Sequence, residues 1–229
     1  MDKVVWLVGG NKGGAGKSVV AKALVEWLRE QAVPITIVDG DKRTPDVAAV
    51  FNGTLPTMQF DLHEDAGWAY YSDYLCQNSL EGHIVTNLPD GINDRAIRFF
   101  ERFAMLAQGY GYKVKVLFAM NTLPDGLNLF ARLVQSFPDI IPVKNLHFGR
   151  EAEFTHFDCA YGPSHGTRAL LLPAMRPAIM LVVRESNLAF SDFIAQSDNA
   201  ESNTTYAKLV AADWRGATLE AFDDILMGE

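Results

Sequence analysis

Gly9-Gly10-Asn11-Lys12-Gly13-Gly14-Ala15-Gly16-Lys17-Ser18 is the stretch of the chain that decides the fold. The residues before it, Lys3–Val8, form a short apolar run with β-branched side chains, which predicts a buried strand. The residues after it carry apolar side chains at helical spacing, which predicts a helix over Lys17–Gln31. The apolar positions of this helix are Val20, Leu24, Trp27 and Leu28. A glycine-rich loop between a strand and a helix is typical of a phosphate-binding site.

The glycines of this loop suit phosphate binding because they let successive backbone N–H groups turn toward one anion. The helix that follows adds the positive end of its dipole. Lys17 would reach the β- and γ-phosphates of a nucleotide, and Ser18 would be a ligand of Mg²⁺. The alternative is a glycine-rich turn that binds nothing. The order of strand, loop, lysine, serine and helix argues against that alternative.

The rest of the chain alternates predicted strands with predicted helices. Pro34 ends the first helix, and Ile35–Val38 follows as a second strand, which completes a strand–helix–strand unit. Further strands are expected at 83–86, 113–120, 140–145 and 169–172, and further helices at 66–78, 93–107, 127–137 and 203–226. The last helix is expected to break near Gly216. This alternation predicts an α/β fold with a doubly wound, mostly parallel sheet flanked by helices, as in P-loop NTPases, with the ligand at the carboxyl ends of the strands.

The composition fits one globular domain. The chain has 229 residues, of which 48% are hydrophobic and 21% charged, and it shows no internal repeat or low-complexity linker. We therefore expect residues 1–229 to form a single nucleotide-binding domain. The net charge of −8 disfavours nonspecific binding of nucleic acid by the whole surface. Without a recognisable signal sequence, a disulfide framework or an apolar run of about 18 residues, the sequence predicts a cytoplasmic protein.

The loop segment Lys12-Gly13-Gly14-Ala15-Gly16-Lys17-Ser18 resembles the deviant Walker A motif of the ParA/MinD family of P-loop ATPases. The usual P-loop has glycine at position 11, where this chain has Asn11, and the second lysine, Lys12, matches the family. The resemblance implies ATP-dependent homodimerisation, in which Lys12 contacts the nucleotide of the partner copy, and catalytic roles for Lys12 and Lys17. It also implies that ATP and Mg²⁺ are bound by a run of loop and helix residues. These residues are Gly13, Gly14, Ala15, Gly16, Lys17, Ser18 and Val19.

The end of the second strand, Ile35-Thr36-Ile37-Val38-Asp39-Gly40-Asp41, resembles the Asp-x-Asp segment of the same family. The resemblance implies that Asp41 orients the attacking water and that Asp39 lies near Mg²⁺. Hydrolysis needs such a carboxylate because the water must lie in line with the γ-phosphate. An ordinary acidic turn at a strand end is the alternative interpretation.

The third motif departs from the family pattern. His83-Ile84-Val85-Thr86-Asn87-Leu88-Pro89-Asp90-Gly91 lies where the family has Asp-Thr-Pro-Pro after a strand. Asn87, or Thr86 with a shift of one residue, takes the place of the Walker B aspartate. Asp90 or Asp94 could supply the missing carboxylate. The substitution predicts slow turnover, or a protein in which nucleotide binding alone acts as the switch.

Two later strand ends resemble the base-binding elements of the family. Asn145, at the end of Pro142-Val143-Lys144-Asn145, matches a purine-contacting asparagine, and Pro173 matches the proline of a loop beside adenine. Each could equally be an ordinary strand terminus. No Asn-Lys-x-Asp motif for guanine follows a late strand, which favours ATP over GTP.

The partners are predicted from the resemblance and from local charge. Later segments resemble the ParA-like proteins of conjugative or mobilisable plasmids, the TraL/StbB/MobD type, which implies a protein partner from a plasmid transfer or partition system. These segments are Phe148-Gly149-Arg150-Glu151, Leu172-Pro173-Ala174-Met175, Phe190-Ser191-Asp192 and the closing helix. Arg95, Arg98 and Arg102 share a helix face that could contact DNA, although a solvated helix face is the more ordinary interpretation. Residues 198–229 carry seven acidic residues and only two basic ones, which argues against DNA contact there and against a membrane-binding helix. A nucleotide-binding adaptor without hydrolysis and a metabolic P-loop enzyme of the dethiobiotin-synthetase type are the alternative functions.

Overall fold

A seven-stranded, all-parallel sheet forms the centre of the computed structural model, with the strand order β3-β2-β4-β1-β5-β6-β7. The structure describes residues 3–10, 14–78, 81–91, 94–137, 139–163, 166–197 and 204–227. The strands are β1 (Lys3–Gly10), β2 (Ile35–Asp39), β3 (Thr57–Gln59), β4 (His83–Asn87), β5 (Tyr112–Met120), β6 (Ile141–Asn145) and β7 (Leu170–Leu172). The predicted α/β fold with a doubly wound sheet is confirmed, and the strands described are all parallel rather than mostly so.

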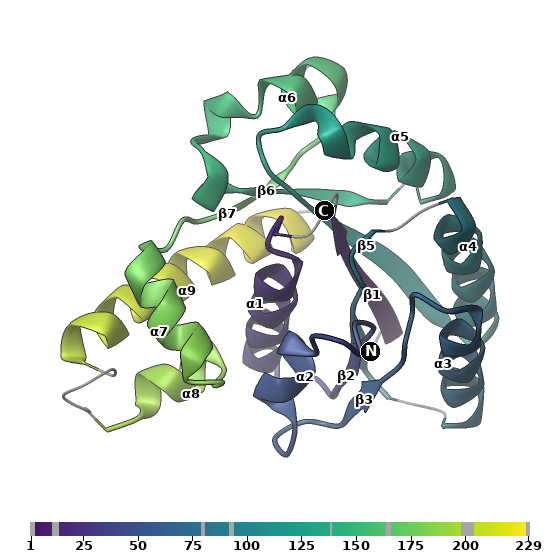
Figure 1. The fold of residues 1–229 in the computed structure, drawn as a ribbon, viewed down its shortest axis with the longest axis horizontal. Coiled ribbons are helices and arrows are strands. Elements are labelled where there is room, and N and C mark those ends of the chain that lie inside the picture. The colour runs from purple at the N-terminus through teal and green to yellow at the C-terminus, as the bar shows by residue number, and fades with distance from the viewer. Residues whose placement is uncertain are drawn as a thin grey trace.

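Helices cover both faces of this sheet (Figure 1). They are α1 (Lys17–Glu30), α2 (Asp46–Phe51), α3 (Asp65–Gln77), α4 (Asp94–Gly109), α5 (Leu127–Ser136), α6 (Thr155–Tyr161), α7 (Pro177–Glu185), α8 (Phe190–Ala195) and α9 (Thr205–Leu226). On one face, α1, α2 and α7–α9 enclose one apolar core, and on the other, α3–α6 enclose a second. The parallel strands direct all their carboxyl ends to one edge, where α1 begins.

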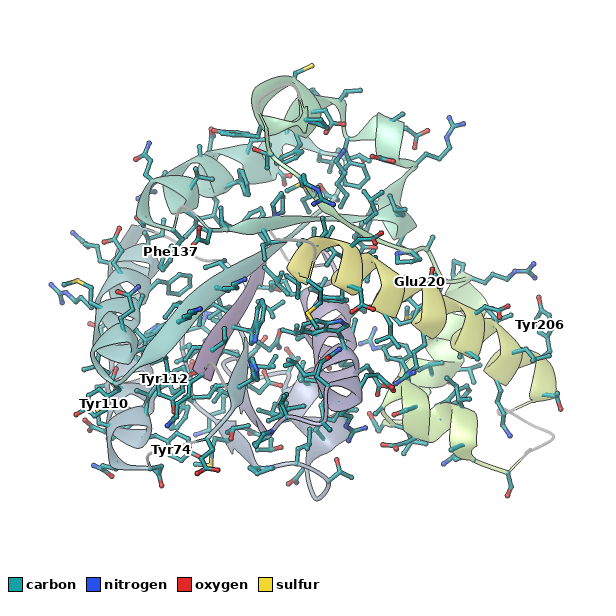
Figure 2. All side chains as sticks on the ribbon, turned by 180° about the vertical axis from the view of Figure 1, so that it is seen from behind. Tyr74, Tyr110, Tyr112, Phe137, Tyr206 and Glu220 are labelled. Atoms are coloured by element: carbon teal, nitrogen blue, oxygen red, sulfur yellow. The ribbon has the colours of Figure 1, made fainter. Side chains whose placement is uncertain are left out.

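Three helices near the C-terminus form a lobe beside α1. Figure 1 shows α7, α8 and the long α9 together on one side of the molecule, away from α3 and α4. Glu26 of α1 is buried and joins this lobe to the sheet, because its carboxylate accepts hydrogen bonds from Ser191 Oγ at 2.9 Å and from Arg215 Nε at 2.7 Å. Tyr206 stands at the outer end of α9, where its ring stacks under the Arg176 guanidinium, and Glu220 lies farther along the same helix (Figure 2).

The structure corrects one expected feature of α9. The helix runs unbroken through Gly216, because Trp214 and Phe222 are buried on either side and anchor both halves to the same core. Thr204 caps its first turn by accepting a hydrogen bond from Ala207 N at 3.2 Å. The anchoring of both halves outweighs the weak helix propensity of one glycine.

The structure bears on two predictions about the surface, the arginine face of α4 and the lack of a membrane-spanning helix. Arg98 and Arg102 are exposed on α4, as a solvated helix face requires, whereas the side chain of Arg95 lies outside the described residues. DNA contact by this face stays a prediction. None of the helices in the described ranges is long and apolar enough to cross a lipid bilayer.

Candidate functional site

A cavity of about 480 Å³ lies at the carboxyl edge of the sheet, where the start of α1 meets the ends of β4, β6 and β7. Most of the predicted site residues line it, namely Gly14, Gly16, Lys17, Ser18, Val19, Asp41, Asn145 and Pro173. Lys12 and Gly13 lie outside the described residues. The volume is in the ordinary range for a site that holds a small ligand.

The described part of the glycine-rich loop has a backbone that only glycine adopts easily. Gly14 and Gly16 have φ values of 88° and 93°, in the left-handed region. Ala15 between them is buried, and its carbonyl accepts a hydrogen bond from Asn145 Nδ2 at 3.1 Å. A Cβ atom on Gly16 would lie 2.2 Å from the same nitrogen. The loop is therefore held against the end of β6 by this hydrogen bond and by close packing at Gly16.

The ammonium of Lys17 is almost fully buried and forms an ion pair with Asp90, which is about half exposed. Asp90 belongs to the loop after β4, which also lines the cavity. A lysine at this point of a phosphate-binding loop typically contacts phosphate oxygens. An anionic ligand that binds Lys17 must therefore displace or share the Asp90 contact.

Asp41 lies on the wall of the cavity in a tight local turn. Its carboxylate accepts hydrogen bonds from Arg43 N at 3.0 Å, from Thr44 N at 3.2 Å and from Thr44 Oγ1 at 2.8 Å. Partial burial acts to raise the pKa of Asp41, but the hydrogen bonds from Thr44 and Arg43 outweigh it, so the pKa lies below its ordinary value. The carboxylate is thus ionised at neutral pH.

Asp39 is fully buried and does not reach the cavity wall. Its Oδ2 accepts hydrogen bonds from Val47 N at 3.0 Å and Ala48 N at 2.9 Å, which caps the start of α2. Its Oδ1 accepts one from Asn87 Nδ2 at 3.0 Å and one from Asp41 N at 3.3 Å. Burial raises the pKa of Asp39, against the lowering effect of these hydrogen bonds.

Asn87 carries an oxygen without a partner. The side chain is 3% exposed and lines the cavity, and its Oδ1 has no hydrogen-bond partner among the residues the structure describes. The register of the sheet pairs Asp39 with Asn87, while Thr86 bonds Tyr71 Oη at 2.6 Å. Of the two candidates for the Walker B position, Asn87 therefore lies on the cavity, whereas Thr86 is buried against Tyr71.

The residues present fit a hydrated Mg²⁺. Ser18 and Asn87 both line the cavity, and the buried Oδ1 of Asn87 has no partner among the described residues, so it could accept a hydrogen bond from a metal-bound water. Asp39 could act only through Asn87, whose amide it orients. No cluster of three or more His, Cys, Asp or Glu side chains suited to a metal occurs in the described ranges.

The other half of the cavity is apolar. Pro173 is half-buried there, and its carbonyl accepts a hydrogen bond from Trp214 Nε1 at 2.7 Å. Asn145 is buried, with its Oδ1 accepting from His147 N at 3.1 Å, so both ends of its amide already have protein partners. Contact of Asn145 or Pro173 with a base stays a prediction.

Sequence reasoning missed two cations that line the same cavity, Lys22 and Arg184. Lys22 follows Ser18 by one helical turn, so its place on the same face of α1 could have been read from the helical period. Arg184 belongs to α7, a helix that the sequence pattern did not indicate. Its place in the cavity depends on how α7 packs, which no local signal reveals.

One curated protein shares recognisable sequence with this chain. MobD of Acidithiobacillus ferrooxidans is 30% identical over 156 residues, which make up 67% of this chain and 68% of that protein. This chain belongs to the MobD family. The predicted resemblance to MobD-type proteins is thereby confirmed. A comparison with protein-family models gave no match.

Solved structures support the fold of this MobD-family chain. MinD of Pyrococcus horikoshii, complexed with Mg-ADP, matches with a TM-score of 0.54 at 17% identity, covering 93% of this chain and 95% of that one. A nucleotide-binding protein of Archaeoglobus fulgidus in complex with ADP matches with a TM-score of 0.53 at 11% identity, covering 80% and 86%. Chloroplast FtsY of Physcomitrella patens has a TM-score of 0.53 at 10% identity, covering 75% and 59%. At these identities the matches establish the P-loop NTPase fold alone.

Proposed function

We propose that this MobD-family chain is a ParA/MinD-like molecular switch that binds ATP and Mg²⁺ in the cavity at the start of α1. The observation that carries the proposal is the buried ammonium of Lys17, which lies beside a glycine loop in left-handed conformation at the N-terminus of a helix. A buried cation, inward N–H groups and a helix dipole together form an anion site. MinD of P. horikoshii and the A. fulgidus protein, which share the fold, were solved with ADP.

In this proposal the residues of the loop bind the nucleotide as their sequence implies. Gly13, Gly14, Ala15, Gly16 and Val19 place backbone N–H groups around the phosphates, and Lys17 neutralises the β- and γ-phosphates. Asn145 and Pro173 border the base. Bound Mg²⁺ would supply positive charge that stabilises the triphosphate, held by Ser18 and, through water, by the oxygen of Asn87 that Asp39 orients.

Asp41 is the group we propose to orient water for hydrolysis. It is ionised, it lines the cavity, and its turn holds it in place. Asn87 favours a second candidate function, because an amide gives the metal less support than the family's aspartate. In that case the protein is an adaptor that binds nucleotide without turnover.

A nucleotide-binding titration tests the proposal. Wild type should bind a fluorescent ADP or ATP analogue in the presence of Mg²⁺, and Lys17→Ala should weaken binding at least about tenfold, since it removes a charge-assisted contact. Arg98→Ala is the matched control, because it removes one positive charge at an exposed site of α4, on the opposite face of the sheet from α1. Equal binding by wild type and Lys17→Ala, or no binding by either, contradicts the proposal.

Phosphate release separates the two candidate functions. Turnover that is lost in Asp41→Ala while nucleotide binding persists supports the ATPase. Binding without turnover, even in the presence of DNA and candidate partner proteins, supports the adaptor.

The partners follow from the family. We infer a single nucleotide-binding domain that acts in the cytoplasm as an ATP-dependent homodimer with a protein partner from a plasmid mobilisation, transfer or partition system. The relation to MobD supports the plasmid partner, and Lys12 supports the dimer.

A further inference from the structure

The cavity continues beyond the phosphate-binding loop toward α7, and two basic side chains face this extension. Lys22 of α1 is half-buried, and Arg184 of α7 is exposed at the mouth. Both line the same cavity as Lys17 and Ser18. Neither belongs to the P-loop motif, and the proposed nucleotide site makes no use of either.

Among the described residues, Lys22 and Arg184 have no ion pair of the kind that Arg215 and Lys144 form. Within the part of the chain that the structure describes, neither the Lys22 ammonium nor the Arg184 guanidinium lies within ion-pair distance of a carboxylate. By contrast, Arg215 pairs with Glu26 at 2.7 Å, and Lys144 pairs with Asp158 at 2.6 Å. Lys22 is partly withdrawn from water, where a cation normally has a partner, so its missing partner indicates a ligand; Arg184 is exposed and free to turn toward that ligand.

Loss of hydration is the main cause that lowers the pKa of Lys22. The attraction of Asp46 raises this pKa by more than the repulsion of Arg184 lowers it, and Asp39 raises it further, but burial outweighs both carboxylates. Two cations that repel each other across a cavity are both stabilised by an anion placed between them.

The wall next to these cations is apolar. It is formed by side chains of α7, of the α7–α8 connection, of α8 and of α9, namely Met180, Val183, Leu188, Phe190 and Trp214. Leu181, three residues before Arg184, extends the apolar surface outward and is 52% exposed. A ligand that fits this region carries a negative group beside an apolar one.

We propose that Lys22 and Arg184 form a second anion subsite of this cavity, which binds a carboxylate carried next to an apolar chain. The carboxylate lies between the two cations, and the apolar chain packs on the wall formed by α7 and α9. The subsite is separate from the phosphates, because Lys22 follows Ser18 by about 6 Å along the axis of α1. The phosphates have their own donors in the loop and in Lys17.

The test uses hexanoate as the probe and hexanamide as its neutral counterpart of the same size. Calorimetric titration of the full chain, with and without saturating Mg-ADP, should give an affinity for hexanoate at least about tenfold higher than for hexanamide. Lys22→Gln should weaken hexanoate binding about fivefold or more, and so should Arg184→Gln, whose exposed position leaves folding intact. Arg98→Gln on α4 is the matched control and should bind hexanoate as wild type does.

Three results overturn the subsite: equal binding of hexanoate and hexanamide, unchanged hexanoate binding in both variants, or an equal loss of Mg-ADP affinity in Lys22→Gln. The last result would make Lys22 a phosphate ligand. If the protein binds no nucleotide, the titration without Mg-ADP still decides the subsite, so the two proposals fail separately.

A capped tripeptide, N-acetyl-Leu-Glu-Leu-amide, identifies the source of the carboxylate. Competition by the peptide that depends on Lys22 and Arg184 indicates an acidic segment of a protein partner. Binding of hexanoate without competition by the peptide indicates a small carboxylic acid. Both results support the subsite and differ only in its natural ligand.

Discussion

Asp90 forms an ion pair with the ammonium of Lys17, so a triphosphate that binds Lys17 has to compete with a carboxylate of the protein itself. Replacing this carboxylate by an amide removes the competition and the repulsion between Asp90 and the phosphates. We predict that Asp90→Asn binds Mg-ADP about fivefold more tightly than wild type, since a half-exposed ion pair contributes about 0.2–1 kcal/mol and the repulsion adds to it. Titration with a fluorescent ADP analogue measures the change.

Asp139→Asn is the control for this prediction, because Asp139 is an exposed carboxylate that does not line the cavity. Its affinity for Mg-ADP should equal that of wild type. A weaker affinity in Asp90→Asn would instead assign Asp90 the supporting role at the metal that Asn87 lost.

Lys22 reduces stability at neutral pH, as a binding residue without a ligand often does. Its folded-state pKa is lower than the ordinary value of 10.5, so the charged form is disfavoured in the folded protein. The cost is complete below the folded-state pKa and disappears as the pH rises through 10.5, where Lys22 is neutral in both states. Lys22→Met should therefore raise the free energy of unfolding at pH 7 by about 0.5–1 kcal/mol.

Urea unfolding at pH 7 and near pH 10 measures this effect. The gain in Lys22→Met should shrink at the higher pH, whereas Arg98→Met should show no such dependence on pH. A loss of stability in Lys22→Met at pH 7 would show that Asp46 and Asp39 compensate the charge of Lys22 after all.

The sequence predicted the residues of the site where a motif carries them, and missed those that depend on packing. The positions of Lys17, Ser18 and Asp41 on the cavity follow from the order of strand, loop and helix. The burial of Asp39 and its four hydrogen bonds could not be predicted, because the donors of these bonds come from α2, β4 and Asp41. The place of Arg184 on the cavity could not be predicted either, because it depends on how α7 packs.

At the scale of elements, Glu26 connects α1 to the lobe of α7–α9 through hydrogen bonds. It is buried and accepts hydrogen bonds from α8 and α9, while Arg215 keeps a second partner in Glu30. We predict that Glu26→Gln lowers the free energy of unfolding by about 2 kcal/mol, less than the loss of a fully buried pair, because Arg215 retains Glu30. Urea unfolding measures it, and Glu220→Gln, at an exposed position of α9, is the control. A change below that of the control would mean that Ser191 and packing alone hold the lobe.

Most of the strands and helices were predicted, including the three-residue strand β7, so length alone does not separate the predicted elements from the missed ones. The strand and helix around the glycine loop, together with β5 and α9, match the expected positions within about two residues. The missing elements are α2, β3, α6, α7 and α8. The α2 helix has six residues and depends on Asp39 for its cap, and β3 has three residues that pair only with β2. Their stability comes from tertiary contacts, which a local pattern does not contain.

At the scale of the whole molecule, the proposed dimer has to overcome the repulsion between two chains of net charge −8. Among the described residues that line the cavity, three carboxylates (Asp41, Asp46 and Asp90) stand against three cations (Lys17, Lys22 and Arg184), so a bound triphosphate makes this edge negative. A second lysine per nucleotide, supplied as Lys12 by the partner copy, would offset this charge and make association depend on the γ-phosphate.

We therefore predict that a nonhydrolysable ATP analogue with Mg²⁺ doubles the mass measured by light scattering, and that ADP with Mg²⁺ gives a much smaller increase. Lys12→Ala should abolish the increase in mass while keeping most of the nucleotide affinity. Arg98→Ala should dimerise as wild type does. The dimer should also become tighter as moderate salt screens the repulsion between the two chains. A mass that stays monomeric with the ATP analogue at every salt concentration would show that one chain neutralises its nucleotide alone, with Lys12 acting within its own loop.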